Sequence, residues 1–212
     1  MKQKFSPLLT GVLILLCTSV IAQKNDVQTV FKKGARSSGG YGALTNQFST
    51  IGGKYVNMAG LYGGWFVNHL IMIGVGGRAM TNNLPVPQQC STDPLRNLSY
   101  EYGQFSLVAE YVVNLNRPVH LAFHLLTGAG FTVQYDLYNG HNGNQNYQDV
   151  VKDEDWFFVA EPGVQLEVNL FKWMRLSPGF SYRATFGSDG RGLSDRKLRN
   201  ISYNATLKFG KF

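Results

Sequence analysis

Hydrophobic and polar residues alternate with a period of two along the stretch 118–135. One set of alternate positions carries large apolar side chains such as Leu121 and Leu125, and the other carries small or polar ones such as His124 and Gly128. A period of two is typical of a β-strand with two different faces. Strands of globular proteins usually span about five or six residues, whereas a tilted strand that crosses a bilayer needs about ten. We therefore predict that this stretch is a membrane-spanning strand.

Seven further segments show the alternation, so the chain is predicted to form eight strands. In the first two, frequent glycines weaken the pattern and leave the pairing register open. Pro162 and Pro178 interrupt two later segments, and because proline lacks a backbone N–H we expect a bulge or local distortion at each. The predicted strands cover residues 36–48, 54–66, 69–80, 98–113, 118–135, 155–170, 173–187 and 198–210.

Short and long connections alternate between these segments. The short ones cover 67–68, 114–117 and 171–172. The connections at the opposite rim are one short segment, 49–53, and three long polar segments, 81–97, 136–154 and 188–197. Short turns at one rim and long loops at the other, with both chain ends at the short-turn rim, are the plan of a bacterial outer-membrane barrel.

The apolar faces of the predicted strands carry more large side chains than a barrel of eight strands can enclose. The interior of such a barrel is only just wide enough to be filled by side chains, so we expect the apolar faces to point outward into lipid. Aromatic residues near the two rims are interpreted as girdles at the membrane surfaces. These are Trp65, Phe66, Tyr111, Phe171, Trp173 and Phe209 at the short-turn rim, and Tyr100, Tyr135, Trp156 and Phe186 at the loop rim.

Small residues and a few charged ones make up the opposite face. A charge at mid-depth in hydrocarbon would cost roughly 2–4 kcal/mol, so we expect these charges inside the barrel. The hairpin around 171–172 places Glu161 near Arg183 and Glu167 near Arg175, which favours two ion pairs. Glu110 is likewise expected near His120 and His124. The predicted polar interior consists of Glu110, His120, His124, Glu161, Glu167, Arg175, Arg183 and Lys208.

Composition agrees with a single β-rich domain. The 212 residues are 44% hydrophobic, 13% aromatic and 16% charged, and they include 24 glycines. This balance favours β structure. After the first quarter of the chain there is no apolar run of about twenty residues, which excludes a helical membrane protein.

The N-terminus has the pattern of a secretory signal peptide. Lys2 and Lys4 precede an apolar run that ends in small residues typical of a cleavage site. We therefore expect a signal peptide over 1–22, a periplasmic lead-in over 23–34 and the barrel over 35–212. Removing the signal peptide would lower the net charge from +7 to +5 and leave a single cysteine, which excludes an internal disulfide.

From about residue 35 onward the chain resembles the small eight-stranded outer-membrane barrels of the OmpA/OmpX kind. The segments 161–164 and 180–183 resemble phrases common in such families. The C-terminal residues resemble the signal by which the barrel-assembly machinery recognises its substrates, although the last one is out of phase with the alternation. These residues are Tyr203, Leu207, Phe209 and Phe212.

The resemblance implies an all-β fold, an eight-stranded antiparallel up-and-down transmembrane β-barrel in the bacterial outer membrane. It also implies outer-membrane lipid, lipopolysaccharide and the barrel-assembly machinery as partners. Such families have diverse functions, so no specific task follows from it.

Two patterns on the inner face suggest chemistry. His120 and His124 could bind a metal ion, and Glu110 with one of them and Ser106 could form a hydrolase triad. With no third histidine or cysteine nearby, and with inward positions away from lipid substrates, we interpret all four as residues of the polar interior. No catalytic residue, metal ligand or cofactor is predicted.

The leading hypothesis is a non-enzymatic outer-membrane protein whose surface loops serve adhesion, binding of a surface protein partner or membrane integrity. Basic loop residues could attract the phosphates of lipopolysaccharide; these are Arg191, Arg196, Lys197 and Arg199. The alternatives are a narrow pore, which requires a water path, and a lipid-modifying enzyme, which requires an outward catalytic cluster. A nucleic-acid partner is not expected.

Overall fold

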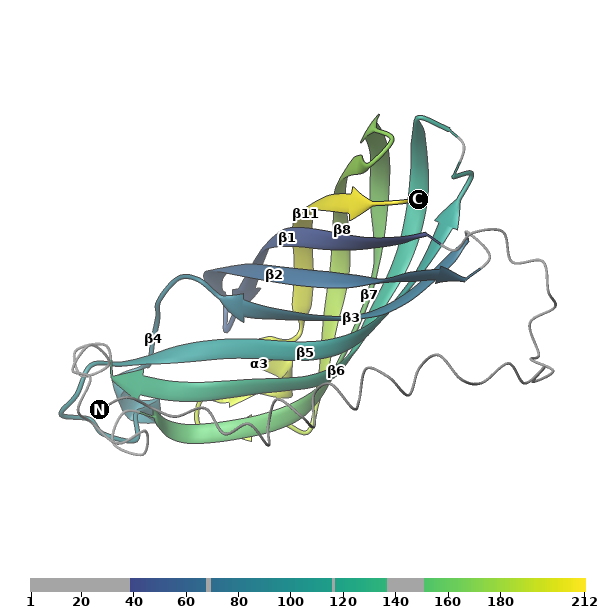
Figure 1. Cartoon of the computed structure of the whole chain (residues 1–212). Coiled ribbons are helices and arrows are strands. Elements are labelled where there is room, and N and C mark those ends of the chain that lie inside the picture. Colours follow the sequence, from purple (N-terminus) through teal and green to yellow (C-terminus); the bar gives the residue numbers. More distant parts are fainter. Residues whose placement is uncertain (1–38, 68–69, 116, 137–150) are drawn as a thin grey trace, which may run out of the picture. The chain divides into compact units, whose positions relative to one another are not determined.

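The computed structural model describes residues 39–67, 70–115, 117–136 and 151–212, which belong to one compact unit. The predicted signal peptide and lead-in lie outside the described residues. Most of the described chain forms long strands (Figure 1). The eight long ones are β1 (Gly40–Ile51), β2 (Lys54–Val67), β3 (Ile71–Met80), β5 (Leu98–Val113), β6 (Val119–Asp136), β7 (Val151–Phe171), β8 (Met174–Phe186) and β11 (Asn200–Gly210).

These eight strands close into a barrel. Consecutive long strands pair antiparallel, β3 with β5 and β8 with β11 included, and β1 pairs with β11 to complete the ring. Each of the eight therefore has a hydrogen-bonded neighbour on both sides. Closure is what a membrane requires, because unpaired N–H and C=O groups cannot be satisfied in hydrocarbon. The predicted eight-stranded up-and-down barrel is confirmed.

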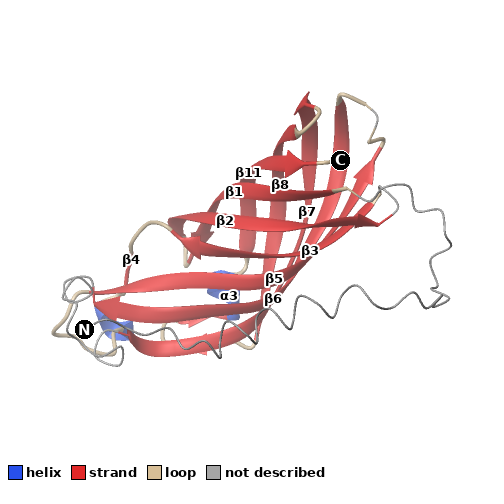
Figure 2. Ribbon diagram, viewed as in Figure 1, coloured by secondary structure: helices blue, strands red, loops and turns tan. Residues whose placement is uncertain are grey.

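Short elements gather at the loop rim, which Figure 2 shows as the end that carries the helical segments. They are β4 (Leu84–Pro85), η1 (Gln88–Cys90), β9 (Asp189–Gly190), β10 (Leu193–Ser194) and α3 (Asp195–Leu198). At the same rim β1 turns into β2 through Gly52 and Gly53, whose φ angles of 57° and 79° favour glycine. Within the described part of the chain, no helix is both long and apolar enough to cross a membrane.

The two prolines do not shift the register of their strands. Pro162 lies opposite Leu125, and Pro178 lies opposite Ala205, each within a continuous antiparallel register. The register irregularities fall elsewhere, between Thr132 and Gln134 of β6 and between Asn169 and Phe171 of β7. The prolines therefore cause a local distortion, as expected, but no bulge. The missing donor is accommodated by gaps in the β7–β8 pairing, which resumes in the same register beyond each proline.

The two faces of the wall differ as predicted. Large apolar side chains such as Leu125 and Leu166 are 42% and 45% exposed and point outward, whereas Glu161 is 1% exposed and points inward. Two of the ten predicted girdle residues are exceptions. Phe66 and Tyr100 are buried in the interior, so they do not belong to the girdles. Phe171, Trp173 and Phe209 do stack on one another outside the short-turn rim.

The interior is filled in three layers. An apolar cluster lies toward the short-turn rim and includes Tyr41, Phe66 and Met72. A second apolar cluster lies toward the loop rim and includes Met58 and Tyr102, and it reaches Leu198 of α3. Buried charged and amide side chains occupy the space between and around them. An eight-stranded barrel has little interior space, and here side chains of both kinds fill it.

Candidate functional site

Five buried charged or titratable side chains form a connected group nearer the short-turn rim, which we call the Lys208 network. Lys208 Nζ lies 2.6 Å from Glu110 Oε2 and also bonds Glu167. Glu167 Oε2 in turn lies 3.0 Å from Arg175 Nη1 and 2.8 Å from His120 Nε2. The network therefore joins β5, β6, β7, β8 and β11 across the interior. The predicted pair Glu167–Arg175 is present.

Aromatic rings close the Lys208 network toward the short-turn rim. Tyr41 donates a hydrogen bond of 2.8 Å to Glu110 Oε1. The guanidinium of Arg175 lies 3.7 Å from the centre of the Phe212 ring, and this ring packs against Tyr41 and Phe66. Cations favour the faces of aromatic rings. The chain end is thus part of the interior packing.

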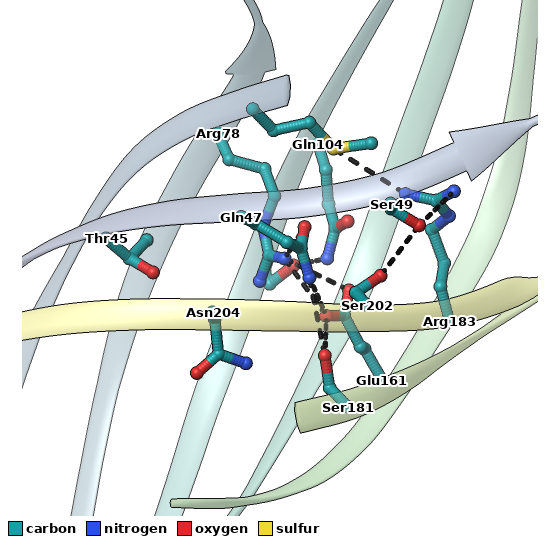
Figure 3. A network of polar contacts seen from close by, with 12 residues as sticks. Thr45, Gln47, Ser49, Arg78, Gln104, Glu161, Ser181, Arg183, Ser202 and Asn204 are labelled. Atoms are coloured by element: carbon teal, nitrogen blue, oxygen red, sulfur yellow. Dashed lines mark hydrogen bonds and ion pairs between the residues drawn. The ribbon is translucent and has the colours of Figure 1, made fainter. Parts of the chain in front are cut away.

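A second group, the Arg78 pair, lies closer to the loop rim and is shown in Figure 3. Arg78 Nη1 lies 3.0 Å from Glu161 Oε1. The same carboxylate oxygen accepts hydrogen bonds from Ser181 Oγ at 2.6 Å and Gln47 Nε2 at 2.5 Å. Buried ion pairs need such additional hydrogen bonds, because each charge has left water.

The predicted pair Glu161–Arg183 is wrong. Arg183 donates instead to the backbone oxygens of Leu198 at 2.8 Å and Thr50 at 3.1 Å, and it lies over the ring of Tyr102. Its side chain therefore points to the loop rim, where it ties α3 to the end of β1. Arg183 acts as a structural clamp beneath the loops, and Arg78 is the partner of Glu161.

Sequence reasoning missed Arg78, although a signal for it exists. Arg78 is an even-numbered residue of β3, like the buried Met72 and Gly74. The odd-numbered residues Ile73 and Val75 face outward. Within this strand Arg78 is the one charged residue. The alternation along β3 therefore indicates an inward position for Arg78. The same alternation correctly indicated inward positions for the eight predicted residues, all of which are buried.

The interior does not assemble the hydrolase triad that the sequence left as an alternative. Ser106 Oγ accepts a hydrogen bond from Gln104 Nε2 at 2.7 Å, and Glu110 bonds Lys208 and Tyr41. His124 lies opposite Glu110 in the β5–β6 register, but the hydrogen bonds of Glu110 go elsewhere. Across the described ranges, no group of three or more His, Cys, Asp and Glu side chains is placed to hold a metal ion.

The four residues of the suggested assembly signal divide between the two faces. Tyr203 and Leu207 are exposed on the outer wall, and Phe209 stacks there on Trp173. Phe212 turns inward onto Arg175, which explains why it is out of phase with the alternation. Whether these residues guide assembly stays a prediction.

Among the described residues, the segments 81–97 and 187–199 form a cap at the loop rim. Carboxylates at the start of β7 anchor it: Asp155 Oδ2 accepts from Ser188 Oγ at 2.7 Å, and Asp153 Oδ2 accepts from the Arg191 amide at 2.9 Å. Gln134 links the two segments through Asp153: its amide donates to Cys90 O and to Asp153 Oδ2, which also accepts from Arg191. These contacts extend β7 four residues beyond its predicted start.

The ring of eight strands, its apolar exterior and its filled polar interior define the class of protein: a transmembrane β-barrel of the small outer-membrane type. Solved structures show the same fold. Neisserial surface protein A matches with a TM-score of 0.52 and 11% identity, over 82% of this chain and 97% of that one. A major outer membrane protein from Thermus thermophilus matches with a TM-score of 0.50 and 10% identity, over 81% and 98%.

Sequence comparisons add nothing to this likeness. No protein-family model matches the chain, and no curated protein matches it. At such low identity the two solved structures show the fold alone, so any task of the protein has to be argued from its own interior and surface.

Proposed function

We propose that the protein is a non-enzymatic, non-conducting barrel of the bacterial outer membrane, whose loop-side cap binds partners outside the cell. The observation that carries this proposal is the filled interior. One apolar cluster lies toward each end, and the Lys208 network and the Arg78 pair occupy interior space beside them. Two interior cavities each have room for about one water molecule. A steady ion path would need a far wider opening.

Conductance tests the proposal against the pore alternative. The folded protein is inserted into planar lipid bilayers, and the current is recorded at fixed voltage and salt. We expect no steady steps of conductance above those of a protein-free bilayer. A stable open level in the native protein would mean that the inner charges line water, and the pore would replace the proposed function.

Location is tested separately. The protein is expected to fractionate with the outer membrane and, because a closed barrel resists detergent, to migrate faster on gels when unboiled. Recovery from the periplasm as a soluble protein would contradict the proposal.

Lipopolysaccharide is the first partner that we propose for the cap. Arg199 lies over the outward ring of Phe186, with 5.0 Å between its Cζ and the ring centre, and it holds Thr185 O. It therefore sits where the outer wall meets the cap. Arg196 and Lys197 of α3 are exposed beside it. Guanidinium and ammonium groups at a membrane surface attract phosphate.

Binding to lipid A tests this partner. Detergent-solubilised barrel is titrated with lipid A and with lipid A lacking its phosphates. We expect the double variant Arg196→Glu, Lys197→Glu to weaken binding to the phosphorylated form. Lys172→Glu, at the exposed turn of the opposite rim, is the matched control and should bind like the native protein. Equal binding by all three proteins would exclude the cap as the phosphate site.

A further inference from the structure

The short-turn rim carries positive charge that no acidic side chain of its turns balances. Arg117, Lys172 and Lys211 are exposed there. No Asp or Glu occurs among the described residues of the turns and chain ends at this rim, which are 39–40, 67, 70, 113–115, 117–118, 171–173 and 210–212. Inside, the two carboxylates and the two basic side chains of the Lys208 network balance one another. The excess positive charge belongs to the rim itself, and the short turns of such barrels face the periplasm.

A recess of about 760 Å³ lies at this rim, between the start of β6, the β7–β8 turn and the chain end. Pockets for small ligands usually measure about 300–1,000 Å³. Lys172 and Arg175 line the polar side of the recess, and Leu170 and Phe171 line its apolar side. Leu170 and Phe171 are 43% and 58% exposed on the outer wall. The recess therefore joins the lipid-facing wall to two cations.

Hydrogen bonds and one ring hold the walls of the recess in place. Asn169, which also lines it, donates from its side chain to Arg117 O at 3.0 Å. The guanidinium of Arg175 is fixed between Glu167, 3.0 Å from Nη1, and the ring of Phe212. A guanidinium has five N–H groups, and the bond to Glu167 uses one of them. Arg175 can therefore also donate to an anion that enters the recess.

The recess lies at the depth of the lipid headgroups. Phe171 and Trp173, which flank Lys172 in the turn, stack with 5.7 Å between their centres, and Trp173 stacks on Phe209 at 6.2 Å. Such aromatic girdles mark the level at which hydrocarbon meets the headgroups. A molecule with an anionic head and an apolar tail would contact both sides of the recess there. A soluble acidic polymer would leave the apolar side, Leu170 and Phe171, without a partner.

We propose that the recess binds one anionic phospholipid of the inner leaflet, of the phosphatidylglycerol type. Its phosphate accepts hydrogen bonds from Lys172 and Arg175, and one acyl chain lies against Leu170 and Phe171. Ammonium and guanidinium groups are common partners of phosphate. A zwitterionic phospholipid fits less well, because it brings a cation of its own next to these two. The site is separate from the cap and does not depend on lipopolysaccharide binding there.

Lipid A is a poor ligand for the recess. Its phosphates are attached to sugar rings that carry several acyl chains, whereas Arg175 lies deep in the recess and is only 4% exposed. A slender phosphodiester of glycerol reaches that depth. Lys172→Glu is therefore expected to weaken the binding of phosphatidylglycerol and to leave the binding of lipid A at the cap unchanged.

Quenching of tryptophan fluorescence by brominated lipids tests the site. Trp65→Phe and Trp156→Phe leave Trp173, beside the recess, as the reporter. The barrel is refolded into mixed vesicles of phosphatidylcholine and phosphatidylglycerol, in which one of the two lipids carries bromine near its headgroup. We expect Trp173 to report about fivefold stronger association with phosphatidylglycerol, the change that one basic residue near an anionic surface produces.

Lys172→Glu should remove this preference. Lys211→Glu is the matched control and should keep most of it, because Lys211 is exposed at the same rim but does not line the recess. Faster gel migration without boiling checks that each variant is folded. Equal loss in both variants would assign the preference to the general charge of the rim and overturn the site. No preference in the native sequence, or its complete loss on adding soluble glycerol phosphate, would overturn the lipid assignment.

Discussion

Neighbouring residues of β6 lie in two different environments, lipid outside the barrel and a packed polar interior inside it. Leu121 and Leu125 point outward and are 44% and 42% exposed, while His120 and His124, one position before each, are buried inside. On the outer face lipid solvates any apolar side chain, so shape matters little and charge is excluded. On the inner face a buried charge is costly without a partner, and Glu167, which is buried there, has His120 among its partners.

The inner face therefore depends on specific contacts, and the outer face depends on composition. Changes that leave an inner charge without its partner should be the most costly, because the partner stays buried. Changes of one apolar residue for another on the wall should cost little. The following substitutions test this contrast, from the largest expected effect to the smallest.

Lys208→Met should destabilise most. It leaves Glu110 and Glu167 facing each other without the ammonium that both contact. Breaking a buried pair costs about 3–5 kcal/mol, and here two carboxylates lose a partner. Urea unfolding in lipid vesicles, followed by tryptophan fluorescence, measures the free energy of unfolding. Lys211→Met, at an exposed neighbouring position, is the control, and equal stability of the two variants would contradict the network.

Arg78→Met should cost about 3–5 kcal/mol as well, because it strands one carboxylate, Glu161. The double variant with Glu161→Gln should recover much of the loss. A double-mutant cycle of Glu161 with Arg183 should show much weaker coupling, since Arg183 bonds backbone oxygens. Stronger coupling of Glu161 to Arg183 than to Arg78 would reverse the assignment of partners.

Leu125→Arg tests the outer face. A charge in the middle of the wall should lower the free energy of unfolding by roughly 2–4 kcal/mol, since hydrocarbon cannot solvate it. Leu95→Arg is the control, because Leu95 lies in the loop-side cap and is 97% exposed. If both substitutions were tolerated equally, the wall around Leu125 would not face lipid.

Phe212→Ala should have the smallest effect of the four. It removes one ring that contacts Arg175 and Tyr41, and such aromatic contacts contribute roughly 0.5–1.5 kcal/mol each. Refolding into vesicles and insertion in cells are compared for this variant. Lower stability in vesicles is the expected result, whereas normal stability with failed insertion in cells would assign Phe212 to assembly alone.

Local alternation predicted a large part of this protein. The eight strands, the short-turn and loop rims, the outward wall and the inward position of residues such as Glu110 and Lys208 follow from a period of two, because successive side chains of a strand point to opposite faces. Phe66 and Tyr100 lie near strand ends but at the even-numbered positions that face inward, so closeness to a rim does not place an aromatic ring in a girdle. Arg78 was missed in a strand whose parity was readable.

Apart from the pair Glu167–Arg175, only the tertiary structure decided which inner side chains meet. Glu167 and Arg175 belong to one hairpin, so counting residues from its turn was enough to pair them. Glu161 and Arg183 belong to the same hairpin, yet Glu161 bonds Arg78 of β3, and Arg183 reaches Leu198 of α3. Lys208 of β11 likewise meets Glu110 of β5 across the barrel. Such contacts depend on strand stagger, closure of the ring and the direction of long side chains, which alternation along one strand does not encode.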